Sequence, residues 1–114
     1  MIVTTVTNCA PHPIKATFTS NGGPLLIQFH GSAWSPQKSS GIGANLLLDG
    51  AVIATAQAFT NEANSHKALV LVNVFTCSVR AGTHTFTVEA ALSPDTKIDQ
   101  NDFFTITVIE YQVS

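Results

Sequence analysis

The last third of the chain alternates apolar and hydroxyl side chains residue by residue. The pattern runs through Ala81–Ala90 and again through Phe103–Tyr111, with Thr recurring at every second position in the middle of each segment. Successive side chains of a β-strand point to opposite faces, so this spacing predicts strands with one apolar and one polar face. A chain built this way must fold into sheets that bury their apolar faces together.

The same kind of segment recurs along the whole sequence, and turn residues separate the segments. Six further strands are expected, and no segment shows a sustained helical period. With 114 residues the chain fits a single domain, residues 1–114. The pattern therefore predicts an all-β fold, an antiparallel β-sandwich of about eight strands with a jelly-roll topology favoured. The six additional strands are Ile2–Val6, Ile14–Ser20, Leu25–Ala33, Ala44–Leu48, Ala51–Ala56 and Lys67–Phe75.

Two turn sequences predict which strands are neighbours. Asp49-Gly50 stands between two strand-like runs, and both central residues of a type I′ turn need positive φ, which Gly tolerates freely and Asp better than most residues. Asn21-Gly22-Gly23 similarly predicts a turn that joins Ile14–Ser20 to Leu25–Ala33 as a second hairpin.

The predicted strand Lys67–Phe75 is apolar on both faces. Leu69 and Leu71 would lie on one side, with Val70 and Val72 on the other. In a domain of this size the outer face needs a cover, and a second copy of the chain is the simplest one. These four residues are therefore predicted to form a homo-oligomer interface, and the low share of charged residues, 11%, favours association.

Charge and the N-terminal sequence restrict partners and location. Five Lys and Arg against seven Asp and Glu are scattered, so no phosphate-binding patch for nucleic acid is expected. The first residues lack the basic start and apolar run of a signal peptide, and no stretch is long enough to span a membrane. We expect a soluble protein, cytoplasmic or associated with a virion or phage. Cys9 and Cys77 allow one disulfide or two separate buried thiols.

Several segments together resemble the small jelly-roll heads of phage tail fibres and bacterial C1q/TNF-like proteins. They are Gly41–Gly50, Asn64–His66, Ala81–Val88 and Asp99–Asp102, the last followed by the closing strand. The resemblance implies a compact sandwich, usually trimeric, that displays loops to a protein receptor or a glycan.

No catalytic set is evident, so we do not expect an enzyme. Gly-x-Ser-x-Gly is absent, as is a phosphate-cradling loop, and no pair of carboxylates marks a glycosidase. No two histidines have a short metal-ligand spacing, so no metal site is expected from them. His84 has the parity of Phe86 and Val88, which predicts a hydrogen-bonded structural residue, whereas His30 is expected at the surface or in an interface. The four histidines are His12, His30, His66 and His84.

Two segments are candidates for ligand binding. Trp34 precedes a Ser/Pro/Lys loop and could stack on a sugar, or it could fill the end of the core or an interface. The Asp95–Asp102 loop carries Asp95, Asp99, Asn101 and Asp102, whose oxygens suit calcium but also suit backbone hydrogen bonds in turns. No cofactor is expected, with calcium left open. A lectin that uses Trp34 and this loop is the alternative to a structural or receptor-binding head.

Overall fold

The computed structural model describes residues 2–8 and 14–111, and within them it contains strands and no helix. Eight of the nine strands are seven residues or longer, and the ninth, β6, has two. The all-β prediction is confirmed. The strands are β1 (Ile2–Asn8), β2 (Ile14–Ser20), β3 (Gly23–Ala33), β4 (Ser40–Leu48), β5 (Ala51–Thr60), β6 (Lys67–Ala68), β7 (Val72–Val79), β8 (Gly82–Ala91) and β9 (Phe104–Glu110).

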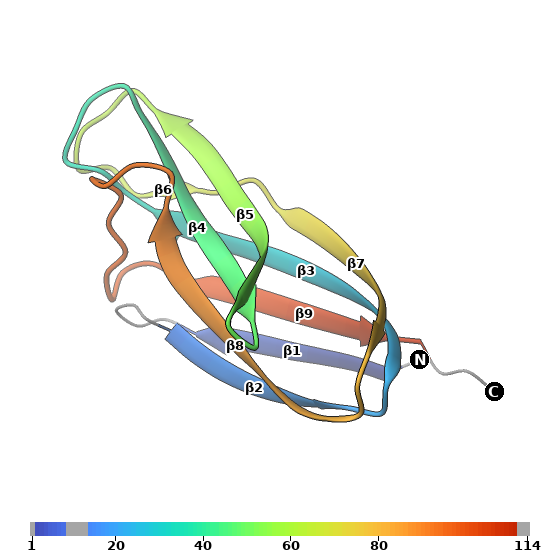
Figure 1. Ribbon diagram of the computed structural model, residues 1–114. Helices are drawn as coiled ribbons and strands as arrows, with labels where there is room; N and C mark the ends of the chain where they lie inside the picture. The colour runs from blue at the N-terminus through green and yellow to red at the C-terminus, as the bar shows by residue number, and fades with distance from the viewer. Residues whose placement is uncertain (1, 9–13, 112–114) are drawn as a thin grey trace.

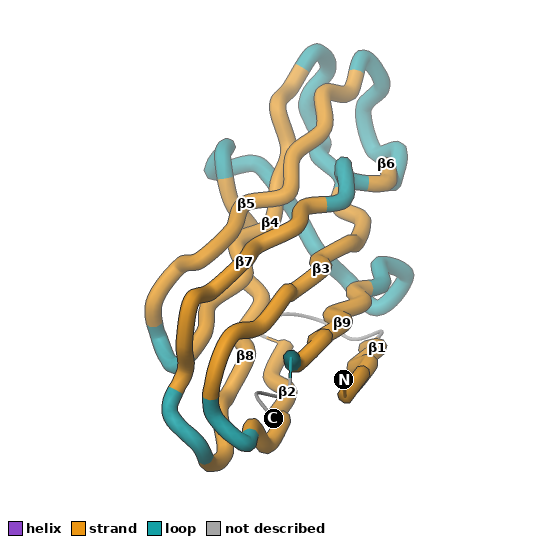
Figure 2. The backbone as a smooth tube through the Cα atoms, turned by 90° about the vertical axis from the view of Figure 1, so that its right-hand side faces the viewer, coloured by secondary structure: helices purple, strands orange, loops and turns teal. Residues whose placement is uncertain are grey.

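The strands form two antiparallel sheets packed face to face (Figures 1 and 2). Sheet one has the order β1-β9-β3, with β7 and the short β6 both pairing β3, and sheet two has the order β2-β8-β4-β5. Strands that are neighbours in sequence thus often lie in different sheets, which is the pattern of a jelly roll. The molecule is elongated, 51 × 20 × 20 Å.

The core lies between the sheets and follows the predicted period of two. On β3, Leu25, Ile27 and Phe29 are fully buried, while the residues between them are partly exposed. On β8, Phe86 and Val88 are buried in the same way from the other sheet. Aromatic rings stack within this core, with Phe29 against Phe104 at 5.9 Å between ring centroids.

The predicted hairpin between residues 14–20 and 25–33 is wrong. β2 pairs with β8 in sheet two, whereas β3 pairs with β9 and β7 in sheet one. The intervening glycines do make a tight turn, with φ of 89° at Gly22 and 111° at Gly23, but the turn crosses from one sheet to the other. Glu110 holds this crossing, because its buried carboxylate accepts from Ser20 Oγ at 2.5 Å and from Asn21 N at 2.8 Å.

The hairpin at Asp49-Gly50 is confirmed. β4 and β5 pair along their whole length around this turn. Asp49 has a φ of 50° and Gly50 a φ of 88°, as a type I′ turn requires.

The single strand predicted over residues 67–75 is wrong. β6 ends at Ala68 and β7 begins at Val72, and the three residues between them leave the ladder. Leu69 is buried in the chain's own core at 2% exposure, while Val70 and Leu71 are 68% and 48% exposed. Val72 and Val74 pack against the core edge. Because the backbone leaves the strand between β6 and β7, the apolar run places Leu69 in the core and Val70 and Leu71 on the outer surface.

This interruption also joins the edges of the two sheets. Leu69 N donates to Gly31 O of β3 at 2.8 Å, and Val70 N donates to Gln57 O of β5 at 2.9 Å. Consecutive backbone amides therefore bond to different sheets. The sandwich is closed by a main-chain hydrogen bond on this side.

Two sequence predictions fall partly outside the described residues. Cys77 is a free, exposed thiol on β7, so the burial expected for it is wrong, because its side chain lies on the outward face of the strand. Cys9 and His12 belong to residues that are not described. In the portion that is described, no helix has the length and apolarity needed to cross a membrane.

Candidate binding site at the Trp34 end

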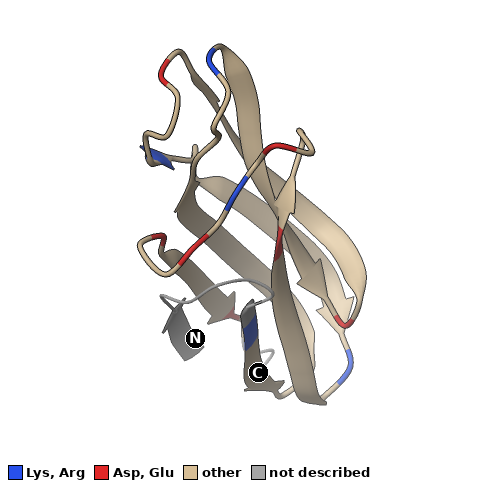
Figure 3. Ribbon diagram, turned by 90° about the vertical axis from the view of Figure 1, so that its left-hand side faces the viewer, with Lys and Arg blue, Asp and Glu red and all other residues tan. Residues whose placement is uncertain are grey.

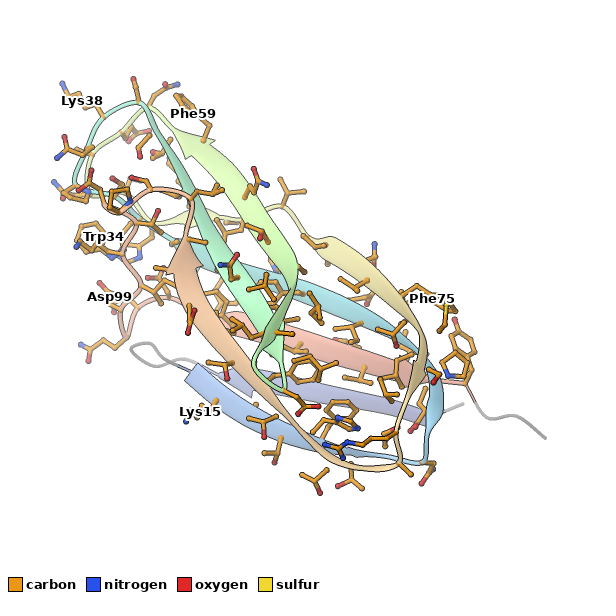
Figure 4. The ribbon with its side chains drawn as sticks, viewed as in Figure 1. Lys15, Trp34, Lys38, Phe59, Phe75 and Asp99 are labelled. Carbon is orange, nitrogen blue, oxygen red and sulfur yellow. The ribbon has the colours of Figure 1, made fainter. Side chains whose placement is uncertain are left out.

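Trp34 lies beside the loop of residues 95–102, although the two are more than sixty positions apart in sequence. Trp34 N donates to Lys97 O at 3.0 Å, and Lys97 N donates to Trp34 O at 2.7 Å, so the loop adds an isolated antiparallel bridge to the end of β3. Figure 4 shows Trp34 and Asp99 at the same end of the sandwich, with Phe75 at the opposite end. The two segments proposed from the sequence thus form one surface.

Asp102 organises this end of the molecule. Its side chain is completely buried, and its oxygens accept from Ser32 Oγ at 2.7 Å and from the backbone N of Asp99 at 2.9 Å. A buried carboxylate is stable only when hydrogen-bond donors replace water, and these donors come from β3 and from the loop itself. Asp102 therefore links the loop to sheet one.

Ser32, on β3, reaches Asp102 because the end of the loop before β9 lies close against β3. The Ser32 hydroxyl donates to Asp102 and accepts from Phe103 N at 3.2 Å, so it acts both as a hydrogen-bond donor and as an acceptor. The preceding residue, Gly31, makes the approach possible, since a Cβ placed there would lie 2.2 Å from the Phe104 ring and 2.8 Å from Phe103 O.

His66 completes the group. Its Nδ1 lies 2.7 Å from Asp102 Oδ1, and its Nε2 lies 3.8 Å from Asp99 Oδ2. Since a carboxylate oxygen can only accept, Nδ1 carries the hydrogen of this bond, and Nε2 is directed toward the Asp99 side. The Trp34 ring lies against the imidazole, with 5.7 Å between centroids. About a third of each side chain is exposed, 34% for His66 and 38% for Asp99.

The other candidate residues of the loop have turn roles or lie apart from this group. Asp99 Oδ1 accepts from Asn101 N at 2.8 Å, and Asp102 N donates to Asp99 O at 3.0 Å, which closes a tight turn before β9. Asp95 N donates to Ser93 Oγ in a separate turn. Converging ligand atoms come from His66, Asp99 and Asp102, and Asp95 does not belong to that set.

Sequence reasoning missed two members of the site. Ser32 lies within a predicted strand, with nothing in its local sequence to mark it as a site residue, and the spacing of His66 to the other histidines says nothing of its distance from the acids of a loop far away in sequence. No local signal identifies either residue, because the contacts depend on how the jelly roll brings residues 32, 66 and 102 together.

The arrangement does not form a nucleophile and base pair. Ser32 Oγ donates to Asp102 and not to His66, and the serine is only 6% exposed. Nucleophilic catalysis needs the hydroxyl within reach of the base and of a substrate. What remains accessible is an aromatic ring, an imidazole nitrogen and a carboxylate, which are groups suited to binding.

His84 pairs with Asp49, away from the Trp34 end, and is a hydrogen-bonded structural residue, as its parity predicted. The side chain is 3% exposed, and its ring stacks on Phe18 at 5.4 Å between centroids. Both ring nitrogens have hydrogen-bond partners within the chain, Asp49 and the carbonyl of Arg80.

Comparison with known proteins gives a clear result for the fold. No protein-family model matches the chain, and no curated protein matches it in sequence. Among solved structures, Eiger TNF from S. frugiperda superposes with a TM-score of 0.56 at 8% identity, covering 98% of this chain and 88% of that one. The globular domain of zebrafish complement 1qA has a TM-score of 0.55 at 11% identity, covering 86% and 70%.

A third similar structure is the EclA C-terminal domain, described as a sugar-binding protein. It has a TM-score of 0.52 at 18% identity and covers 96% of this chain and 79% of that one. Likeness at such low identity concerns the fold alone. The chain is a β-sandwich with the jelly-roll fold of C1q and TNF heads, as the sequence resemblance implied.

Proposed function

We propose that this chain is a self-associating binding head, which assembles through the outer face of sheet one and presents the Trp34 end to a ligand. The observation that carries the proposal is the composition of that outer face. Among the described strands β3, β7 and β9, no Lys, Arg, Asp or Glu points outward. The outward residues are Leu26, Gln28, His30, Asn73, Phe75, Cys77, Thr105, Thr107 and Ile109.

An apolar row crosses this face at one end. Leu26 on β3 pairs with Phe75 on β7 and with Ile109 on β9, so the three side chains lie side by side. Phe75 is 62% exposed, and Tyr111 extends the row with a ring 6.5 Å from that of Phe75. Charged residues are depleted at the centres of protein interfaces, and aromatic residues are enriched there. Figure 3 shows that Lys, Arg, Asp and Glu lie mostly in loops and turns.

The resemblance to C1q and TNF heads favours a trimer. Val70 and Leu71, proposed from the sequence as interface residues together with Leu69 and Val72, are exposed near the β7 edge of sheet one and could extend the contact. Leu69 is enclosed in its own core and contributes only by holding this segment in place. The similar structures, mainly sugar-binding, C1q and TNF modules, support a binding role over a catalytic one.

Light scattering after size-exclusion chromatography tests the assembly. We expect the wild-type chain to be oligomeric at micromolar concentration and Phe75→Ser to weaken association at least tenfold, or about 1.4 kcal/mol. Phe59→Ser is the matched control, because Phe59 is similarly exposed at 65% but lies on β5 of the other sheet. A monomeric wild type, or equal effects of the two substitutions, would contradict the proposed interface.

Carbohydrate binding at the Trp34 end is the second candidate function. Aromatic faces stack on sugar rings, and nearby carboxylates accept from sugar hydroxyls. The favouring observation is that Trp34 and Asp99 lie on one surface, and a similar structure is described as sugar-binding. A glycan array probed with the wild-type chain should give hits that Trp34→Ala removes and Phe59→Ala retains. An array without hits, with and without calcium, would rule this role out.

A further inference from the structure

His66 and Asp99 place a nitrogen and an oxygen where one ion could contact both. Nε2 of His66 and Oδ2 of Asp99 are 3.8 Å apart, and one ligand atom from each of His66, Asp99 and Asp102 lies within 4.8 Å of the others. Tetrahedral ligands about 2.1 Å from a zinc ion lie about 3.4 Å from one another. A movement of a few tenths of an ångström would therefore bring both atoms onto one ion.

Asp102 fixes the orientation of the His66 ring through its Nδ1 atom, on the side away from the proposed ion. Asp102 is buried and held by Ser32 Oγ and by the Asp99 amide, so it offers Oδ1 as a fixed acceptor for the Nδ1 hydrogen of His66. A carboxylate that accepts from one imidazole nitrogen and directs the other at a metal is the common outer shell of histidine metal sites. The ring is therefore presented in the tautomer that a metal needs, with the Nε2 lone pair on the Asp99 side.

The ligand chemistry favours a zinc-type ion over calcium. Calcium takes six to eight hard oxygen ligands, whereas this group offers one imidazole and a small number of carboxylate oxygens, several of which already accept hydrogen bonds. Imidazole combined with carboxylate suits Zn²⁺ and its neighbours in the transition series.

We propose that His66 and Asp99 bind a divalent transition metal ion of the zinc class, with Asp102 and Ser32 as positioning residues. Water fills the remaining coordination positions, which are open to solvent beside the Trp34 ring. The proposed metal site does not depend on self-association or on sugar binding, since all of its residues, and the hydrogen bonds that position them, belong to one chain.

Calorimetric titration of ZnCl₂ into the full chain tests the site, with Cys9 and Cys77 both replaced by Ser so that thiols cannot bind the ion. We expect one equivalent of zinc to bind. His66→Gln and Asp99→Asn should each weaken binding at least tenfold, and the glutamine retains a donor for Asp102. His30→Gln is the matched control, because His30 lies outside the group, against Phe103. Absence of binding by the wild type, or binding that survives in His66→Gln, would overturn the proposal.

The positioning role is tested separately with Ser32→Ala, which keeps both ligands. Removing an outer-shell partner commonly costs 10- to 100-fold in metal affinity, so we expect weakening of about tenfold or more. Trp34, the only tryptophan, supplies an independent readout, because Cu²⁺ bound at His66 should quench its fluorescence in the wild type and not in His66→Gln. Unchanged zinc affinity in folded Ser32→Ala would exclude the positioning role, and equal quenching in both proteins would contradict the location of the site.

Discussion

His84 lies between two hydrogen-bond acceptors, Asp49 and the Arg80 carbonyl, of which Asp49 has the larger effect on the pKa of the ring. Nδ1 donates to Asp49 Oδ2 at 2.6 Å, and Nε2 donates to the carbonyl oxygen of Arg80 at 2.7 Å. Two acceptors on the two ring nitrogens favour the imidazolium form, in which both nitrogens carry a hydrogen. The hydrogen bond to Asp49 is the main reason that the pKa of His84 is raised above 6.5, and the same bond lowers the pKa of Asp49 below 3.8.

This pair makes stability depend on pH in a defined window. The contribution of His84 is complete below 6.5, its unfolded pKa, and is lost as the pH rises through the raised folded value. The contribution of Asp49 is present above 3.8 and is lost as the pH falls through its lowered folded value. We therefore expect the difference in Tm between wild type and Asp49→Asn to be largest between about pH 4 and 6.5. Asn keeps the turn and the acceptor for Thr85 N, so a difference that does not vary with pH would show that the charge is unimportant.

Ser32→Ala should destabilise the Trp34 end even without a ligand. A hydrogen bond to a charged group contributes about 1.5 to 3 kcal/mol, and this change also leaves the Phe103 amide without its acceptor. Urea unfolding measures the loss. Ser40→Ala is the control, since that half-buried hydroxyl donates only to the neighbouring Gly41 carbonyl, and we expect a change within about 0.5 kcal/mol. Equal effects would argue against a special role for Asp102.

Gly31 and Gly41 should respond oppositely to alanine. A Cβ at Gly31 meets the Phe104 ring at 2.2 Å and Phe103 O at 2.8 Å, and the backbone oxygen cannot move aside easily. We expect Gly31→Ala to cost about 1 to 3 kcal/mol or more through overpacking. At Gly41, also on a strand, nothing lies within 4 Å, so alanine should be neutral or stabilise by about 0.5 kcal/mol. Thermal or urea unfolding of the two variants measures this contrast, and a stable Gly31→Ala would disprove the close approach.

Cys77 can report on the proposed interface. The thiol is free and exposed, and it shares the outward face of β7 with Phe75. In a Cys9→Ser background, reaction with a thiol reagent should be fast for dilute protein and slower at concentrations where the chain associates. Phe75→Ser should abolish this dependence on concentration, whereas Phe59→Ser should retain it. Reactivity that is independent of concentration in an oligomeric sample would place the interface elsewhere.

The sequence determines which face of each strand is buried, but not which strands are neighbours. Leu25, Ile27 and Phe29 follow a period of two that results from strand geometry alone, so their burial could be predicted. The strand that pairs with β2 could not be predicted, because a turn with two glycines fits either a hairpin or a crossing between sheets. The choice is made by contacts distant in sequence, such as that between Ser20 and Glu110.

The candidate site could be predicted only in part for the same reason. Trp34 and the loop acids are recognisable from their chemistry, since an aromatic residue beside a polar loop and clustered carboxylates suggest binding in any context. His66 was not, because its role arises from Asp102, which is 36 positions away in sequence. The two-sided apolar run at residues 69–72 was misassigned to one strand, since a backbone turn and a doubly covered strand give the same residue pattern.

The bond from Val70 N to Gln57 O affects how the molecule comes apart. The two sheets cannot separate on this flank unless this hydrogen bond to β5 breaks. The adjacent amide, that of Leu69, is bonded to β3 of the other sheet. We therefore expect the two sheets to separate on this flank only in one concerted step, in which both hydrogen bonds break together.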